Sequence, residues 1–549
     1  MPEPWLTPPP LQPPALDPPL ARPQPRLLLP PSRPERLALP LALFDSGIAN
    51  ANSVIIPIAT SSPTKIRRLV TLRLSVGSVV LLRCFIMTEK IWHGFWWLPG
   101  HEHRRIAGTL HVQDSGDTRL TLIGGFDVQK ADRTPVNDNN TRGSRTILGQ
   151  SESVKITLVG GYPSLWHGSA ISPDYQEVRG SRVLVGAHVQ LSNDPVFSSV
   201  SLTLENFGTF LVRHAFDRTA ESKEQSNSVV YRPEDKIEFS ADTWNFQVYT
   251  YFPGFQTRDR RGFGAVDGVT SEVLIATSAI PRPLTDFDEI ATLFTDLLTL
   301  ASGEACGVIG MSLDLAEDDA AVYPPGDARS YRVVQVYGSR THTAEPNSPL
   351  HQPGRFRFTC SDLSFEALTR AWIPLRRRAR AATNLLFGLY YIRRGFTETR
   401  LLSAAVVAES LHSALFDIQR RWSKTEFKSI RAAISEGLSD SEQLRWVEDR
   451  IKNETSFKEK LIQLAALPDQ EAVAAIVGDS QDWARKLVDA RNGLAHTGAD
   501  TNKSGDIFDL AEVTLFVASL ALMQELGLPG DVQRKAFQRS EYLSVIRHN

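Results

Sequence analysis

The chain has 549 residues, more than one hydrophobic core normally organises, so we expect two or three domains. Its formal net charge is −2, which excludes a basic field over the whole molecule, and any nucleic-acid contact requires a local patch. The three cysteines, Cys84, Cys306 and Cys360, lie far apart and predict neither a disulfide framework nor a metal cluster, which favours a reducing, cytoplasmic setting.

Residues 1–86 differ in composition from the rest of the chain. Nearly half of the 34 prolines fall within residues 1–40, where they oppose a continuous helix or sheet. Residues 2–86 contain no methionine and few acidic residues. We therefore interpret residues 1–86 as a Pro-rich disordered or non-native extension, and we hypothesise that translation starts at Met87.

No membrane span or export signal is expected from the sequence. The most apolar stretch, residues 69–86, is interrupted by Arg73, Gly77 and Arg83. The first residues are rich in proline and lack the basic and apolar regions of a secretory signal.

Residues 87–362 show the short alternating pattern of β-strands between turn residues. We expect loops at 138–143 and 258–264 and one amphipathic helix over 286–302. The strand-like runs include residues 108–112, 119–125, 183–186, 200–204, 308–313 and 331–337. This segment is predicted to be a β-rich domain.

Residues 363–549 have helical spacing instead. A stripe of apolar residues three or four positions apart predicts one long core helix: Leu401, Ala404, Ala408, Leu411, Leu415, Ile418 and Trp422. Further helices are predicted at 364–394, 426–437, 441–452, 456–465, 469–477, 480–495 and 506–526. The predicted fold class is therefore α+β multidomain, a β-rich domain followed by an all-α bundle.

Several catalytic signatures are missing from the sequence: the phosphate-binding loop of NTPases, the nucleophile elbow of hydrolases, the zinc-protease helix and paired Cys-x-x-Cys motifs. His101 and His103 have strand spacing, but they lack a third ligand, and Arg104 and Arg105 would repel a cation. We expect no metal and no cofactor.

The segment Arg491-Asn492-Gly493-Leu494-Ala495-His496 places an arginine and a histidine five positions apart. Within a regular helix these positions are about 140° apart around the axis. Gly493 and the Thr497-Gly498 stop indicate a helix end, which we expect to let both side chains converge. A histidine can remove the proton of an RNA 2′-hydroxyl, and an arginine can bind the charged phosphorane oxygens. Two copies in a symmetric dimer would supply both base and acid.

This spacing is weak evidence by itself. Arg105 with His111 and Arg182 with His188 satisfy it too, in strand-like segments. The alternative interpretation of Arg491 and His496 is a surface arginine and a helix-capping histidine. The small residues between them and the surrounding helices favour the catalytic interpretation.

Two regions resemble a known family. The motif from Arg491 to His496, with the preceding helical segment Leu401–His412, resembles the HEPN superfamily of helical, metal-independent ribonucleases, in particular its ApeA-like branch. Residues 94–100, followed by the runs at 106–110 and 120–125, resemble the start of the β-rich domain that precedes HEPN in ApeA proteins. The resemblance implies an anti-phage endoribonuclease acting by abortive infection, with a phage-derived trigger sensed by the N-terminal domain and an RNA-cleaving HEPN homodimer.

By this resemblance Arg491, His496 and Asn492 match the catalytic motif, and Glu409 matches an acidic position of the long helix. Glu409 has a second interpretation as a stabilising partner of a neighbouring base. The arginines of the basic run could guide RNA through phosphate contacts or form a solvated face: Arg376, Arg377, Arg378 and Arg380. The alternative function is a non-catalytic scaffold, or a module that binds nucleotide or a partner protein.

Overall fold

The computed structural model of the chain describes residues 54–57, 69–72, 89–113, 115–126, 145–168, 174–213, 216–221, 226–231, 234–252, 255–257, 266–268, 270–316, 333–338, 353–392, 395–416, 421–496 and 504–538. All of these residues belong to the second of two compact units, Ser53–Asn549. Within the proposed extension the strands β1 (Val54–Pro57) and β2 (Leu69–Leu72) pair antiparallel. The interpretation of residues 1–86 stays a prediction, and the two predicted loops lie outside the described residues.

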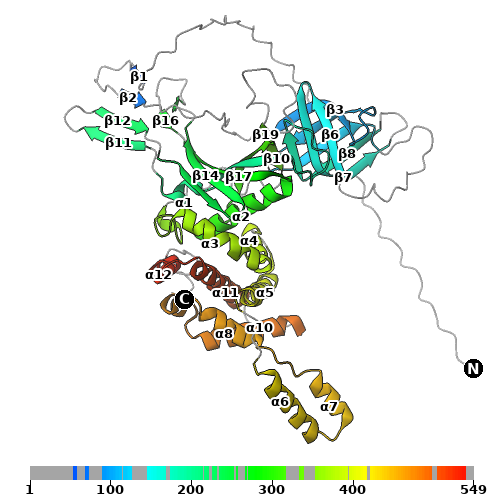
Figure 1. Ribbon diagram of the computed structural model, residues 1–549, viewed down its shortest axis with the longest axis vertical. Helices are drawn as coiled ribbons and strands as arrows, with labels where there is room; N and C mark the ends of the chain where they lie inside the picture. Colours follow the sequence, from blue (N-terminus) through cyan, green and yellow to red (C-terminus); the bar gives the residue numbers. More distant parts are fainter. Residues whose placement is uncertain are drawn as a thin grey trace, which may run out of the picture. The chain divides into compact units, whose positions relative to one another are not determined.

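Six strands close into a small barrel (Figure 1). They are β3 (Lys90–Trp97), β4 (Ile106–Val112), β5 (Thr118–Ile123), β6 (Arg145–Ser151), β7 (Val154–His167) and β8 (Tyr175–Gly180). The ring closes because β7 pairs with β6 through its first half and with β8 through its second half. Trp96 is fully buried in the barrel core opposite Gly149 of β6. A Cβ at Gly149 would lie 2.2 Å from the Trp96 ring, so this position requires glycine.

The sheet continues beyond the barrel as a second, open part. Strand β9 (Arg182–Val185) pairs with β7 on one side and β19 on the other. The remaining order from β19 is β18, β10, β17, β14 and β13. Their bounds are β10 (Phe197–Leu204), β13 (Ile237–Ala241), β14 (Trp244–Tyr251), β17 (Ser271–Arg282), β18 (Val308–Leu315) and β19 (Val333–Gly338). The separate hairpins are β11 (Phe216–Glu221) with β12 (Ser226–Tyr231), and β15 (Phe255–Thr257) with β16 (Val266–Gly268).

Helix α2 (Leu284–Ser302) is the predicted amphipathic helix and joins the open sheet to the helical part. Phe287 contacts the rings of Phe197 and Trp244 from the sheet. On the helical side, the indole of Trp372 donates a hydrogen bond to the Leu293 carbonyl (2.8 Å). The short helix α1 (Phe207–Leu211) and a 3₁₀ helix at Pro353–Arg355 complete the elements around this core.

The segment predicted as a single helix over 364–394 is two helices, α3 (Phe365–Arg378) and α4 (Arg380–Tyr391). They meet at Ala379, whose φ of −98° and ψ of 24° leave the helical region. Ala379 is 1% exposed, and its small side chain fits this buried corner. The expectation of one continuous helix was therefore wrong.

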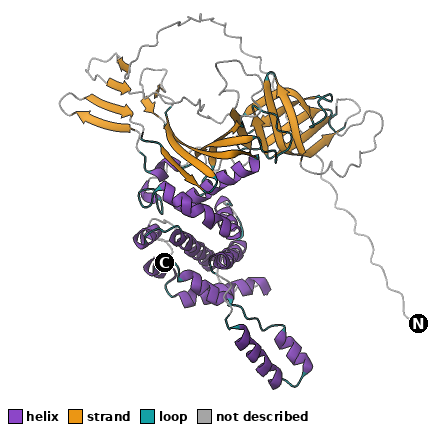
Figure 2. Cartoon of the chain, in the orientation of Figure 1, coloured by secondary structure: helices purple, strands orange, loops and turns teal. Residues whose placement is uncertain are grey.

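The other helices form the bundle seen in purple in Figure 2. They are α5 (Thr397–Leu415), α6 (Lys424–Gly437), α7 (Ser441–Glu448), α8 (Phe457–Ala465), α9 (Gln470–Val477), α10 (Ser480–His496), α11 (Ser504–Glu525) and α12 (Gly530–Gln538). The stripe of Leu401, Ala404, Ala408 and Leu411 is fully buried, as predicted.

Two details of the bundle differ from the prediction. Helix α5 ends at Leu415 because Phe416 is extended, and the backbone of Trp422 instead donates to the side chain of Asn453. Ile418 lies outside the described residues. Helix α12 was not predicted. The fold class is confirmed: a β-rich region followed by a helical one. Across the described part of the chain, no helix combines the length and apolar character that a membrane crossing requires.

Candidate active site

Helix α10 carries the predicted arginine and histidine motif. Its first turn is capped by Asp479, whose Oδ1 accepts from the backbone N–H groups of Gln481 (2.7 Å) and Asp482 (2.9 Å). The helix is anchored by a buried face of Trp483, Ala484, Leu487 and Ala490, and the indole of Trp483 donates to Thr514 of α11. The face follows the spacing of an amphipathic helix, so the position of Arg491, next to Ala490, is fixed at the edge of the core.

Arg491 combines a packed guanidinium with access to solvent. Its guanidinium lies 4.8 Å from the ring centre of Phe457 on α8, a cation–π contact. Its Nη2 lies 3.6 Å from Oε2 of Glu409 on α5, which is an ion pair but too long for a hydrogen bond. The side chain is 36% exposed. Arg491 is thus oriented by its neighbours while part of its guanidinium faces solvent.

His496 is the last residue of α10, and its side chain lies outside the described residues. The helix predicted over 480–495 is confirmed, since α10 spans Ser480–His496 and includes Gly493. The convergence of the Arg491 and His496 side chains stays a prediction. Thr497 and Gly498 are not described. Positions 491 and 496 therefore keep their helical separation of about 140°. Asn492 is exposed beside Arg491.

Glu409 is shared by two bases from two other helices. Lys460 of α8 donates from its Nζ to Oε1 of Glu409 at 3.0 Å, and Arg491 approaches the second carboxylate oxygen. The partners of Glu409 thus lie on α8 and α10 rather than on its own helix. Sequence reasoning missed Lys460 and Phe457. The capping box of Ser456 and Glu459 predicts the start of α8, but no local signal links Lys460 to a residue 51 positions earlier.

His412 lies one turn after Glu409 and braces the same pair of helices. Its Nε2 is 2.7 Å from Oε1 of Gln463, which follows Lys460 by one turn of α8. The imidazole also stacks on Phe416 at 4.4 Å. Burial, followed by the positive charge of Lys460, lowers the pKa of His412, although Gln463 and Glu409 oppose this shift. His412 therefore favours its neutral form and holds α5 against α8.

The basic run at the corner of α3 and α4 is neutralised by carboxylates from four other positions. Arg376 is 8% exposed and pairs with Asp296 at 2.7 Å. The other three pairs are Arg377 with Asp242, Arg378 with Glu525 and Arg380 with Glu289. Asp296 belongs to α2 and Glu525 to α11, so ion pairs of the basic run connect the corner of α3 and α4 to both of these helices. RNA contact by these arginines stays a prediction, and it would require exchange of these partners.

The described residues contain no group of three or more histidine, cysteine or acidic side chains placed to hold a metal ion. His101 and His103 contact one another, with ring centres 6.0 Å apart. Cys306 and Cys360 are free thiols. Burial raises the pKa of Cys306 to about 11 and that of Cys360 to about 12, so neither is a reactive thiolate near neutral pH.

Two family models match the chain. ApeA N-terminal domain 1 matches residues 91–372, more than half of the chain, and Apea-like HEPN matches residues 402–532. The second match contains Glu409, Lys460, Arg491 and His496. Comparisons with curated proteins and with solved structures found no match.

Proposed function

The chain belongs to the ApeA N-terminal domain 1 family and carries an Apea-like HEPN domain, and on this premise we propose that it is a metal-independent endoribonuclease of anti-phage defence. HEPN domains of the ApeA type indicate a nuclease-like defence effector. RNA as the substrate, the homodimer, the phage-derived trigger sensed by the β-rich domain, abortive infection and a cytoplasmic location are parts of the proposal.

One observation supports a catalytic role for Arg491 above the others. A purely structural arginine at the edge of a core would be expected to use its donors on close hydrogen bonds. Arg491 instead is stacked on Phe457, lies 3.6 Å from Glu409 and is 36% exposed. A guanidinium held in this way can bind a phosphate without first breaking a short hydrogen bond.

The proposed reaction uses the nucleophile that RNA itself carries. His496 removes the proton from a 2′-hydroxyl, the 2′-oxygen forms a bond to the adjacent phosphorus, and the bond to the 5′-oxygen breaks. Arg491 binds the non-bridging oxygens as negative charge gathers on them, and Asn492 offers a neutral amide to the same phosphate. The leaving 5′-oxygen takes a proton from His496 of a second copy. The products are a 2′,3′-cyclic phosphate and a 5′-hydroxyl.

The 140° separation of positions 491 and 496 supports the need for two copies. A dimer that brings two α10 helix ends together would combine the arginine of one copy with the histidine of the other. Glu409 is proposed as a positioning residue, because it contacts Arg491 and lies on a different helix from the motif.

The decisive experiment is RNA cleavage by the full chain, because the hydrophobic core runs without a break from the open sheet through α2 into the helices. Wild type, His496→Ala and Arg491→Ala are compared in excess EDTA, with analysis of the product ends. The matched control is Arg485→Ala, an exposed arginine on the same helix that pairs with Asp482. We expect cyclic-phosphate products from wild type and the control, and none from the two variants.

Activity in both variants, or products without a cyclic phosphate, would refute this mechanism. If the purified chain is inert, the same set is purified from phage-infected cells, since the proposed trigger is then present. Inactivity there as well would favour a non-catalytic scaffold.

A further inference from the structure

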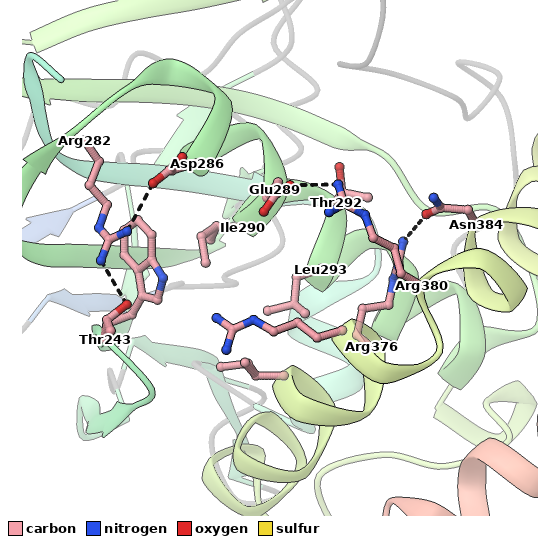
Figure 3. Close-up of a pocket in the computed structure, with 13 residues that line it drawn as sticks. Thr243, Arg282, Asp286, Glu289, Ile290, Thr292, Leu293, Arg376, Arg380 and Asn384 are labelled. Carbon is pink, nitrogen blue, oxygen red and sulfur yellow. Dashed lines mark hydrogen bonds and ion pairs between the residues drawn. The ribbon is translucent and has the colours of Figure 1, made fainter. Parts of the chain in front are cut away.

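A cavity of about 330 Å³ lies between the open sheet and the corner of α3 and α4 (Figure 3). Helix α2 supplies one wall through Asp286, Glu289, Ile290 and Leu293, which lie on one helical face. The cavity is far in sequence from Arg491 and His496, and neither of them lines it. Of the predicted site residues, only arginines of the basic run do. Its volume falls in the range of small-molecule sites, about 300–1,000 Å³.

Arginines dominate the charge of the cavity wall. Arg282, Arg376, Arg377 and Arg380 line it, against the two carboxylates Asp286 and Glu289. The further partners Asp242 and Asp296 pair with Arg377 and Arg376 but do not line the cavity. They orient two of the guanidiniums without occupying the space in front of them.

Two of the arginines are held in different ways. Arg282 is fixed: it donates to Asp286 (3.1 Å) and Thr243 (3.0 Å) and stacks 4.9 Å from the ring centre of Trp244. Arg380 is held loosely, because its 2.8 Å ion pair with Glu289 joins side chains that are 67% and 66% exposed. An exposed pair of this kind contributes little stability, so an incoming anion can take the place of Glu289. Figure 3 shows Arg282 and Arg380 on opposite sides of the cavity.

The cavity also has an apolar part. Ile290, Leu293 and Ile373 line it, and each is less than a tenth exposed. Figure 3 shows Ile290 and Leu293 between the two arginines. A ligand that fits must therefore combine an oxyanion with an apolar or aromatic portion.

We propose that this cavity binds a small phosphate-bearing ligand with an apolar or aromatic portion, held between Arg282 and Arg380. The ligand would lie where the β-rich region meets the helices, and Arg378, two residues before Arg380, pairs with Glu525 of α11. Binding at this cavity does not depend on ribonuclease activity.

The test is calorimetric titration of the full chain with ATP and, separately, with inorganic pyrophosphate, without added metal. We expect saturable binding of ATP, weaker by about tenfold in Arg380→Gln, because that variant loses a charge-assisted hydrogen bond. Glu289→Gln should bind ATP about threefold more tightly, because the competing carboxylate is gone. A gain of affinity cannot result from misfolding. Pyrophosphate should bind more weakly than ATP, because it leaves the apolar wall uncovered.

Two controls separate this cavity from other anion sites. Arg431→Gln removes a partly exposed arginine that pairs with Glu448 on the α6–α7 hairpin, and it should leave ATP binding unchanged. Arg491→Gln should also leave it unchanged. The proposal is overturned if no saturable binding of ATP is seen, if Arg491→Gln rather than Arg380→Gln weakens it, or if pyrophosphate binds as tightly as ATP.

Discussion

Lys460 lies closer to Glu409 than Arg491 does: its Nζ is 3.0 Å from Oε1, whereas Nη2 of Arg491 is 3.6 Å from Oε2. The carboxylate therefore interacts more strongly with the lysine than with the arginine. This arrangement leaves one net positive charge on the three side chains, at the arginine proposed to bind phosphate.

Replacing Lys460 should strengthen the ion pair between Glu409 and Arg491. In Lys460→Met, Glu409 loses its nearer partner and draws Arg491 toward itself, so RNA binds less well. We expect the KM for RNA cleavage to rise by about threefold to tenfold with a smaller change in kcat. Lys460→Arg should restore the KM, and Lys458→Met, two residues earlier on α8, should leave it unchanged. A fall in kcat at constant KM would contradict this role.

Arg376 and Arg380 of the basic run should contribute differently to the stability of the fold. Breaking the buried pair of Arg376 and Asp296 by Arg376→Gln should lower the free energy of unfolding by about 3 kcal/mol, because the buried Asp296 carboxylate loses its ion pair with Arg376. Arg380→Gln should change it by less than about 1 kcal/mol, since that pair is exposed. Urea unfolding of both variants measures the difference. Equal effects would show that the burial of Arg376 does not matter.

His412 should make the stability depend on pH. Its pKa is lowered in the folded chain by burial, so the unfolded chain binds more protons as the pH falls through the ordinary value of 6.5. The stabilisation by neutral His412 is complete above that value and is lost as the pH falls toward the lowered pKa. His412→Gln should therefore lose less stability than wild type between about pH 7.5 and about pH 5.5.

Urea midpoints at the two pH values measure this effect. His188, whose pKa is also lowered by burial, remains in the variant, so part of the pH dependence should persist. An unchanged slope in His412→Gln would show that His412 contributes nothing to it.

Gly149 should tolerate no side chain. Gly149→Ala places a methyl group 2.2 Å from the Trp96 ring, which is fully buried and cannot move away. Overpacking of this kind should lower the free energy of unfolding by about 1–3 kcal/mol. Gly388→Ala in α4, where nothing lies within 4 Å of the new Cβ, is the control and should stabilise by about 0.5–1 kcal/mol. Thermal unfolding of the two variants, monitored by circular dichroism, compares them.

Periodicity along the chain was enough to predict the β-rich region, helix α2 and most helices of the bundle. These elements depend on which face of each segment is apolar, a property that neighbouring residues determine. The same local information placed Arg491 and His496 in the last turns of a helix. The motif also resembles ApeA-like HEPN proteins, and the family matches confirm this resemblance.

The contacts between elements were decided only by the tertiary structure. The pairing of Glu409 with Lys460, the burial of Arg376 against Asp296 and the closure of the barrel by β7 and β8 all join residues that no local pattern connects. The sequence does not distinguish a charged residue that is exposed to solvent from one that forms an ion pair. Its partner depends on how the helices and strands pack, and that packing also set the corner at Ala379.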